Sequence, residues 1–188
     1  PTSESTRLQT INILCRQVGK IIHDFTCAGL YRYSPEWSNF EYDFARNQVV
    51  LTDLDSSLNL DELSPDLRML QALRDLGSVV YRTISKFYTP SVLDQYTLTN
   101  LLKYNPLFEL ILGYFPSADE QQVKEITKKL WNCFIPYFFL VKKHREAIQG
   151  GKWSSERRRR YKMDHDLFYI LSMTMLYPLF QRSDVFDL

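Results

Sequence analysis

Apolar residues recur at steps of three and four along most of this chain, and this spacing constrains its fold more than any other feature. Such a spacing places apolar side chains on one face of a helix. The segments that carry it span about 5–26, 64–87, 91–115, 117–149 and 155–181. The spacing therefore predicts a mainly helical protein.

Local signals at the ends of these segments support the helical interpretation. Ser64-Pro65 is a typical helix start, with Ser as the cap and Pro in the first turn. The run 117–120 (Ser-Ala-Asp-Glu) has the spacing of a capping box, in which the Ser and Glu side chains satisfy unpaired backbone N–H groups. Pro106 and Pro136 predict a break and a bend.

The composition indicates a single folded domain that spans residues 1–188. Apolar residues make up 45% of the chain and its formal net charge is only +1, so no overall field favours nucleic acid as a partner. The three cysteines have no metal-ligand spacing, and we expect reduced thiols and a cytoplasmic location. The most apolar runs, 131–141 and 167–180, are shorter than the ~20 residues of a membrane span; we expect buried core helices and no membrane span.

A single segment departs from the helical spacing. Residues 40–42 and 48–52 have the composition of two short strands around a polar turn, with Asn39 before the first strand and Asp53 and Asp55 after the second. The two ends of a hairpin lie close together, and carboxylate and amide oxygens are the ligands that Mg²⁺ prefers. The segment therefore predicts one hairpin and a metal site formed by these three side chains.

The same segment resembles the catalytic loop and metal-binding strand of the protein-kinase-like fold, in particular its aminoglycoside and choline phosphotransferase branch. That branch has a helix that ends in Leu-His, then Gly, then H-G-D-x-x-x-x-N, a hairpin and I-D-F-D. The matching positions here are Ile21-Ile22-His23, Gly29, Asn39, the strand Val49–Asp55 and, in a later helix, Arg74-Asp75-Leu76.

The resemblance covers about residues 8–87, and it implies a kinase-like C-terminal lobe with a catalytic-loop region over 29–55 and a helical region over 64–182. It implies Mg²⁺ and ATP as cofactors and Asp53 as the principal metal ligand. Asp75 would brace the catalytic loop from below.

Two departures from the family pattern bear on activity. Ser34 stands where the family has its catalytic Asp, and a hydroxyl cannot accept the substrate proton as a carboxylate does. Glu36 and Glu41 are the nearest carboxylates that could substitute for it. The family's Gly-rich loop and strand Lys have no match in this sequence, so the resemblance implies an N-terminal lobe outside this chain or lost from the fold.

The densest charge cluster is Arg157-Arg158-Arg159-Arg160. As the solvated first turns of a helix this run needs no partner, but a basic run at a helix N-terminus opposes the helix macrodipole, so a site for a phosphorylated or acidic ligand is the alternative interpretation. Two functions remain open on the sequence. The first is a phosphotransferase lobe that binds Mg-nucleotide and transfers a phosphoryl or nucleotidyl group to an acceptor. The second is an inactive pseudokinase or a helical protein–protein interaction module.

Overall fold

The structure is a computed structural model, and it describes residues 4–32, 36–53, 57–59, 63–87, 105–133 and 155–183. The mainly helical fold predicted from the sequence is confirmed. In chain order the elements are α1 (Glu4–Cys27), β1 (Leu30–Arg32), the 3-10 helix η1 (Trp37–Asn39), β2 (Phe40–Asp43), β3 (Gln48–Leu51), β4 (Ser57–Asn59), α2 (Pro65–Phe87), α5 (Pro106–Tyr114), a helix over residues 120–133 and α7 (Ser155–Phe180).

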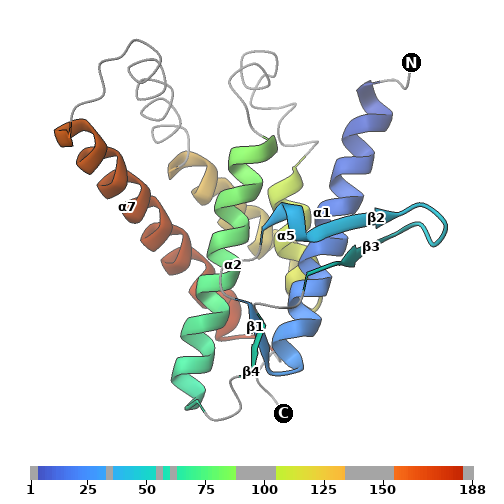
Figure 1. Cartoon of the computed structure of the whole chain (residues 1–188), viewed down its shortest axis with the longest axis horizontal. Coiled ribbons are helices and arrows are strands. Elements are labelled where there is room, and N and C mark those ends of the chain that lie inside the picture. Colours follow the sequence, from blue (N-terminus) through green and yellow to red (C-terminus); the bar gives the residue numbers. More distant parts are fainter. Residues whose placement is uncertain are drawn as a thin grey trace.

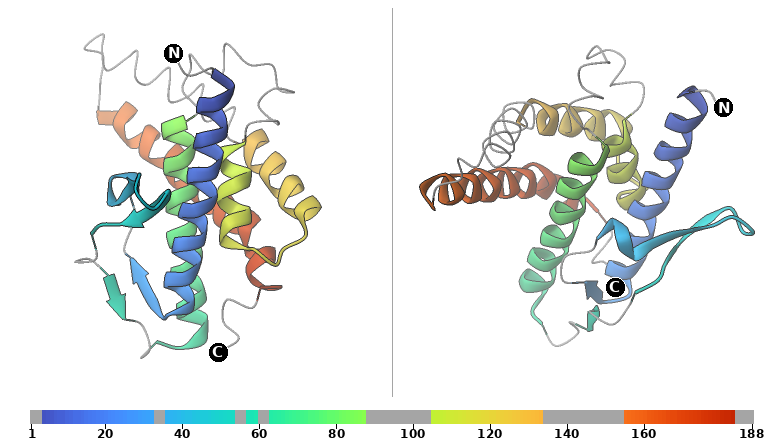
Figure 2. Two further views of the ribbon diagram at one scale, coloured as in Figure 1. Left: turned by 90° about the vertical axis from the view of Figure 1, so that its right-hand side faces the viewer. Right: turned by 45° about the horizontal axis from the view of Figure 1, so that its top comes forward.

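The long helix α1 separates two parts of the molecule. The strands lie along one side of α1, whereas α5 and the helix over residues 120–133 lie along the other (Figure 2, left). Helix α2 runs between α1 and α7, and it contacts both α5 and α7 (Figure 1). Helix α1 also contacts β1 and β3, and α2 contacts β1 and η1.

Helices α1 and α5 approach each other closely at one glycine on each helix. A Cβ atom on Gly19 would lie 2.1 Å from the carbonyl oxygen of Leu110, and a Cβ atom on Gly113 would lie 2.1 Å from that of Arg16. Only glycine lets two backbones approach so closely. An ion pair beside the crossing joins Arg16 to Glu109 at 2.8 Å.

Three aromatic rings join the ends of α5 and α7 to α1. Tyr114, Phe115 and Phe180 are almost fully buried and pack edge to face, with centroid distances of 4.8, 5.0 and 5.5 Å. Such aromatic pairs stabilise a core by more than the burial of their apolar area alone provides. The Tyr114 hydroxyl also lies 3.0 Å from the hydroxyl oxygen of Thr26 on α1. These contacts hold the C-terminal end of α1 in the core.

The predicted hairpin is present as the antiparallel pair of β2 and β3, from Phe40 opposite Leu51 to Asp43 opposite Gln48. A second antiparallel pair, β1 with β4, was not expected. Both strands lie in stretches, 30–39 and 53–63, for which no helix or strand was predicted. A strand of three residues is too short to show an alternating pattern, which explains why these two strands were missed.

One predicted helix start is confirmed and one is wrong. Helix α2 begins at Pro65, as predicted. Helix α5 begins at Pro106, the position of the predicted break, and the side chain of Asn105 accepts a hydrogen bond from the backbone of Phe108. The predicted capping box at residues 117–120 is wrong. The helix begins at residue 120, and Asp119 caps it by accepting the N–H of Gln121 at 3.2 Å. Asp is as good a cap as Ser, and here it lies closer to the first turn.

The predicted helical stretches 91–104 and 134–149, with the bend at Pro136, lie outside the described residues. Helix α7 matches its predicted range, but its apolar residues are not all buried. Leu176, Leu179 and Phe180 belong to the core, whereas Leu167 and Ile170 are each 58% exposed. None of the helices in the described ranges combines the length and apolar character that crossing a lipid bilayer requires.

Candidate functional site

Asn39 closes the open end of the hairpin with both its side chain and its backbone. Its side-chain oxygen Oδ1 accepts the backbone N–H of Glu36 at 3.0 Å, and its Nδ2 donates to Oδ2 of Asp53 at 3.1 Å. Its backbone carbonyl accepts from the N–H of Thr52 at 2.9 Å and from the Thr52 hydroxyl at 3.2 Å. The structure therefore brings Asn39 and Asp53 into direct contact, as the placement of these residues in the sequence predicted.

The position of Asn39 is fixed by contacts between η1 and α2. The indole N–H of Trp37 donates to the hydroxyl of Thr83 at 3.1 Å, and the Trp37 ring packs at right angles on Phe87 with a centroid distance of 5.0 Å. One residue earlier, the carboxylate of Glu36 pairs with Arg82 at 2.7 Å. These contacts hold η1 on the last turns of α2, and so they hold the site on a rigid support.

The hairpin is attached to α1 as well. The side-chain oxygen Oε1 of Gln17 accepts the backbone N–H of Val49 at 2.7 Å, and Val49 is buried. At the far end of the hairpin, Asp43 accepts the N–H groups of Ala45 and Arg46 at 2.9 and 3.2 Å. An Asp that bonds the backbone ahead of it stabilises a tight turn. Asp53 therefore follows a strand that is fixed at both ends.

Asp and Asn are residue types that bind Mg²⁺ in proteins, because both side chains carry hard oxygen ligands. The orientation of Asn39 differs from that of a ligand. Its oxygen is engaged by the Glu36 N–H, and its amino group faces Asp53. In the ranges that the structure describes, no group of three or more His, Cys, Asp and Glu side chains is placed to hold a metal ion. Asp55 lies outside those ranges, and the metal site stays a prediction.

The structure tests the position of only some of the predicted catalytic and anion-binding residues. Glu36 is exposed, and its carboxylate is held by Arg82 and lies 3.4 Å from the hydroxyl of Ser38. Ser34 lies outside the described residues. The run 157–160 lies within α7, but its side chains are not among those described, so the predicted phosphate or acidic-ligand site there stays a prediction.

Asp75 is a buried carboxylate beneath the hairpin. It is only 4% exposed and accepts a hydrogen bond from Nε2 of Gln71 at 2.9 Å. It also lines a cavity of about 20 Å³, together with Thr26 of α1 and Phe40 and Leu51 of the hairpin. A cavity of this size holds about one water molecule. Asp75 therefore lies where α1, α2 and the hairpin meet, the place that a brace of the site region would occupy.

Sequence reasoning missed the residues that position the site. Trp37, Thr83, Arg82 and Gln17 contribute through contacts between elements that lie far apart in the chain. No local pattern marks such residues. The one available signal was the presence of Glu36 and Trp37 shortly before Asn39.

We compared the chain with protein-family models, with curated proteins and with solved structures, and none of the three comparisons found a match.

Proposed function

We propose that the junction of Asn39 and Asp53 is the metal-dependent phosphate site of a kinase-like lobe, and that this lobe binds Mg-nucleotide. One observation carries the proposal. Two side chains fourteen positions apart in the sequence meet at 3.1 Å, at the open end of a hairpin that the sequence pattern marks as a metal-binding strand. The resemblance to the aminoglycoside and choline phosphotransferases supplies the substrate class, a nucleoside triphosphate.

The two side chains have different roles in this proposal. Asp53 is exposed and offers a carboxylate to a cation, so we assign it the role of direct ligand. Asn39 presents its amino group to Asp53, so we assign it the role of orienting that carboxylate. Bound Mg²⁺ would neutralise charge on the nucleotide phosphates, which is the larger part of catalysis in phosphoryl transfer.

The attachment of the site to two helices also supports the proposal. Catalysis of phosphoryl transfer depends mainly on positioning, and η1 is fixed on α2 through Trp37 and Glu36 while β3 is fixed on α1 through Gln17. A site of this kind needs a rigid support, whereas a hairpin that only connects two helices needs no such attachment.

The proposal is tested by thermal unfolding of the chain with ATP alone, Mg²⁺ alone and both together. We expect a rise in midpoint only with both ligands, because the cation bridges Asp53 and the phosphates. Asp53→Ala should abolish this rise, whereas Ser34→Ala should leave most of it. Asp66→Ala is the matched control, since Asp66 is an exposed carboxylate at the start of α2. An Asp53→Ala protein that responds to Mg-ATP like the parent would refute the proposal.

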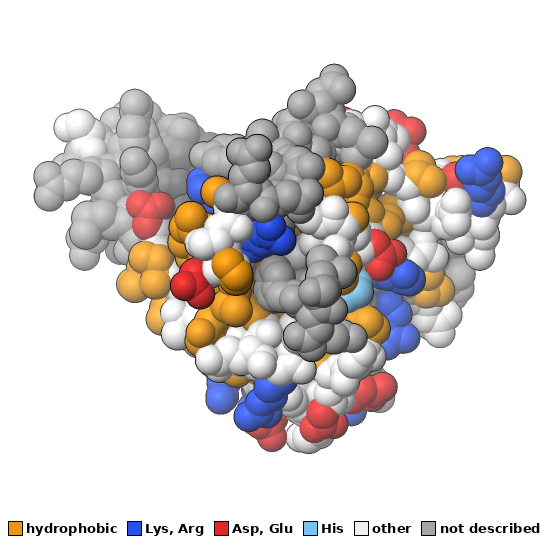
Figure 3. Space-filling view, turned by 90° about the horizontal axis from the view of Figure 1, so that it is seen from below, with side chains coloured by type: hydrophobic (Ala, Val, Ile, Leu, Met, Phe, Trp, Pro, Cys, Tyr) orange, Lys and Arg blue, Asp and Glu red, His pale blue; other side chains and the backbone are white. Residues whose placement is uncertain are grey.

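A second function, a helical protein–protein interaction module, is favoured by the exposed apolar side chains of α7. Leu167, Ile170, Leu171 and Tyr177 are between 37% and 58% exposed, and apolar side chains gather on the α7 side of the face shown in Figure 3. Sedimentation equilibrium tests this alternative. Self-association of the parent that Ile170→Glu removes, without a response to Mg-ATP, would favour the module over the nucleotide site.

A further inference from the structure

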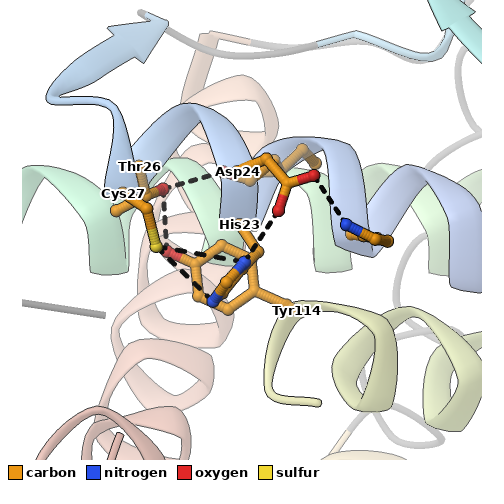
Figure 4. Close-up of polar contacts among 7 residues, drawn as sticks. His23, Asp24, Thr26, Cys27 and Tyr114 are labelled. Carbon is orange, nitrogen blue, oxygen red and sulfur yellow. Dashed lines mark hydrogen bonds and ion pairs between the residues drawn. The ribbon is translucent and has the colours of Figure 1, made fainter. Parts of the chain in front are cut away.

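The last two turns of α1 carry four polar side chains that contact one another in sequence. The ammonium group of Lys20 lies 2.8 Å from Oδ2 of Asp24, and the other carboxylate oxygen, Oδ1, lies 3.1 Å from Nδ1 of His23. The Sγ atom of Cys27 lies 3.5 Å from the second ring nitrogen of His23, Nε2, and 3.9 Å from Nδ1 (Figure 4). A thiol, an imidazole and a carboxylate are thus arranged in a chain of hydrogen bonds.

The contacts assign the proton positions on His23. A carboxylate accepts hydrogen bonds only, so Nδ1 carries a proton and donates it to Asp24. In the neutral ring Nε2 is then an acceptor, and it is the ring nitrogen nearer to the sulfur of Cys27. In nucleophilic sites, a carboxylate that accepts the N–H of an imidazole fixes the tautomer of the general base in the same way.

Asp24 is suited to this positioning role because it stays ionised. Burial opposes its ionisation, but hydrogen bonds from Lys20 and His23 together outweigh burial and lower the pKa of Asp24 below its ordinary value. An ionised carboxylate stabilises the imidazolium that forms when His23 takes a proton.

Residues of α5 hold the cluster from the other side. The ring of Tyr114 meets the His23 ring edge to face at 6.0 Å, and its hydroxyl bonds that of Thr26. The titratable side chain in contact with the thiol is thus His23, and the groups around His23 are Asp24 and, through Asp24, Lys20 from α1 and Tyr114 from α5. Cys27 itself is half-buried and packs against the edge of the core.

We propose that Cys27 is a reactive thiol that forms a mixed disulfide with a low-molecular-weight disulfide, with His23 as its proton acceptor and Asp24 as a positioning residue. The thiol transfers its proton to Nε2, and the sulfur attacks one sulfur of the disulfide. A new S–S bond forms at Cys27 while the reagent's S–S bond breaks, so the Cys27 sulfur is oxidised and the departing sulfur is reduced. The departing thiolate takes a proton, and His23 returns to its neutral form.

The two other cysteines provide comparisons within the same protein. Cys15, on α1, is fully buried. Burial raises the pKa of its thiol far above the ordinary range, and the charge of Glu109 adds a smaller contribution. Cys133 is half-buried like Cys27, which makes it the comparison matched for exposure. A metal site is the other chemistry that Cys, His and Asp could serve, but no metal-binding group of this kind is found in the described part of the chain.

The test is to treat the native protein with oxidised glutathione, quench with acid and locate the adduct by peptide mapping. We expect the adduct on Cys27 to form at least about tenfold faster at pH 7 than on Cys133, because the thiolate is the attacking species. Cys15 should react only after unfolding. An adduct that forms on Cys133 as fast as on Cys27 would refute the proposal.

Variants separate the acid–base role from a structural one. His23→Gln and Asp24→Asn should each slow alkylation of Cys27 by iodoacetamide about tenfold at pH 7 and move its rate plateau to higher pH, because the thiol then ionises without the imidazole. Asp43→Asn, the same change at the hairpin turn, should alter neither. Thermal unfolding confirms that each variant is folded. An unchanged pH–rate profile in a folded His23→Gln or Asp24→Asn protein would overturn the proposal.

Discussion

The glycine contact between α1 and α5 predicts that adding a single methyl group to α1 will destabilise the protein. In Gly19→Ala the new Cβ would lie 2.1 Å from the carbonyl oxygen of Leu110 and 2.9 Å from the backbone nitrogen of Tyr114. Both neighbours are backbone atoms, so no change of side-chain rotamer relieves the overlap. The helices must separate by roughly 1 Å to restore ordinary van der Waals contact.

The magnitude follows from two opposing effects. Overpacking a well-packed contact costs about 1–3 kcal/mol. The upper end applies because the new Cβ atom would meet backbone atoms of α5, which cannot move independently of that helix. Replacing Gly by Ala inside a helix returns about 1 kcal/mol through its better helix propensity. We therefore expect Gly19→Ala to lower the free energy of unfolding by about 2 kcal/mol.

Urea unfolding followed by circular dichroism measures this change. Gly113→Ala should cost a similar amount, because its Cβ would meet the carbonyl of Arg16 at the same crossing. The double variant should cost less than the sum of the two, since one separation of the helices relieves both clashes. If Gly19→Ala instead stabilised the protein by about 1 kcal/mol, propensity alone would account for the change and the close crossing would be wrong.

Two further predictions concern the hairpin and the α1–α5 interface. Asn39→Ala should lower the free energy of unfolding by about 1–2 kcal/mol, because the hydrogen bonds to Glu36 and Asp53 are both lost. Urea unfolding measures this change, and an unchanged free energy would mean that these bonds do not stabilise the hairpin. Burial raises the pKa of Glu109 above its ordinary value of 4.5, against the opposing effect of Arg16. Ionised Glu109 is thus less favourable in the folded state, so its contribution to stability falls as the pH rises from 4.5 through the raised value. Glu109→Gln should remove this part of the pH dependence of stability, and an identical profile in parent and variant would contradict the buried position of the carboxyl group.

The helices were predictable from the sequence because their signals are local and repeated. Apolar spacing over more than twenty residues identifies α1 and α2, Pro65 marks the start of α2, and Pro106, predicted as a break, is where α5 begins. The hairpin was predictable for the same reason, since its turn and its two strands lie within about a dozen positions. The meeting of Asn39 and Asp53 follows from that hairpin alone.

The remainder depends on contacts that no local pattern encodes. Strands β1 and β4 have three residues each and are stable only as a pair. The sequence marks Gly19 only as a weak point in a helical pattern, and its role is visible only when the backbone of Leu110 and Tyr114 is known to lie against it. In the sequence His23 stands out only as the helix-end position of the family pattern, and its link to Cys27 depends on the side-chain orientation that Tyr114 and Asp24 impose.

The central claim, that Asn39 and Asp53 form a Mg-nucleotide site, is tested most directly with Mn²⁺ as a paramagnetic substitute for Mg²⁺. The side-chain amide of Asn39 can be followed by NMR in isotope-labelled protein, together with the backbone N–H of Thr52, which bonds the Asn39 carbonyl. The account predicts that Mn-ATP broadens these two signals first and that Asp53→Asn removes the effect. Signals that stay sharp, or that broaden equally with Asp53→Asn, would contradict it.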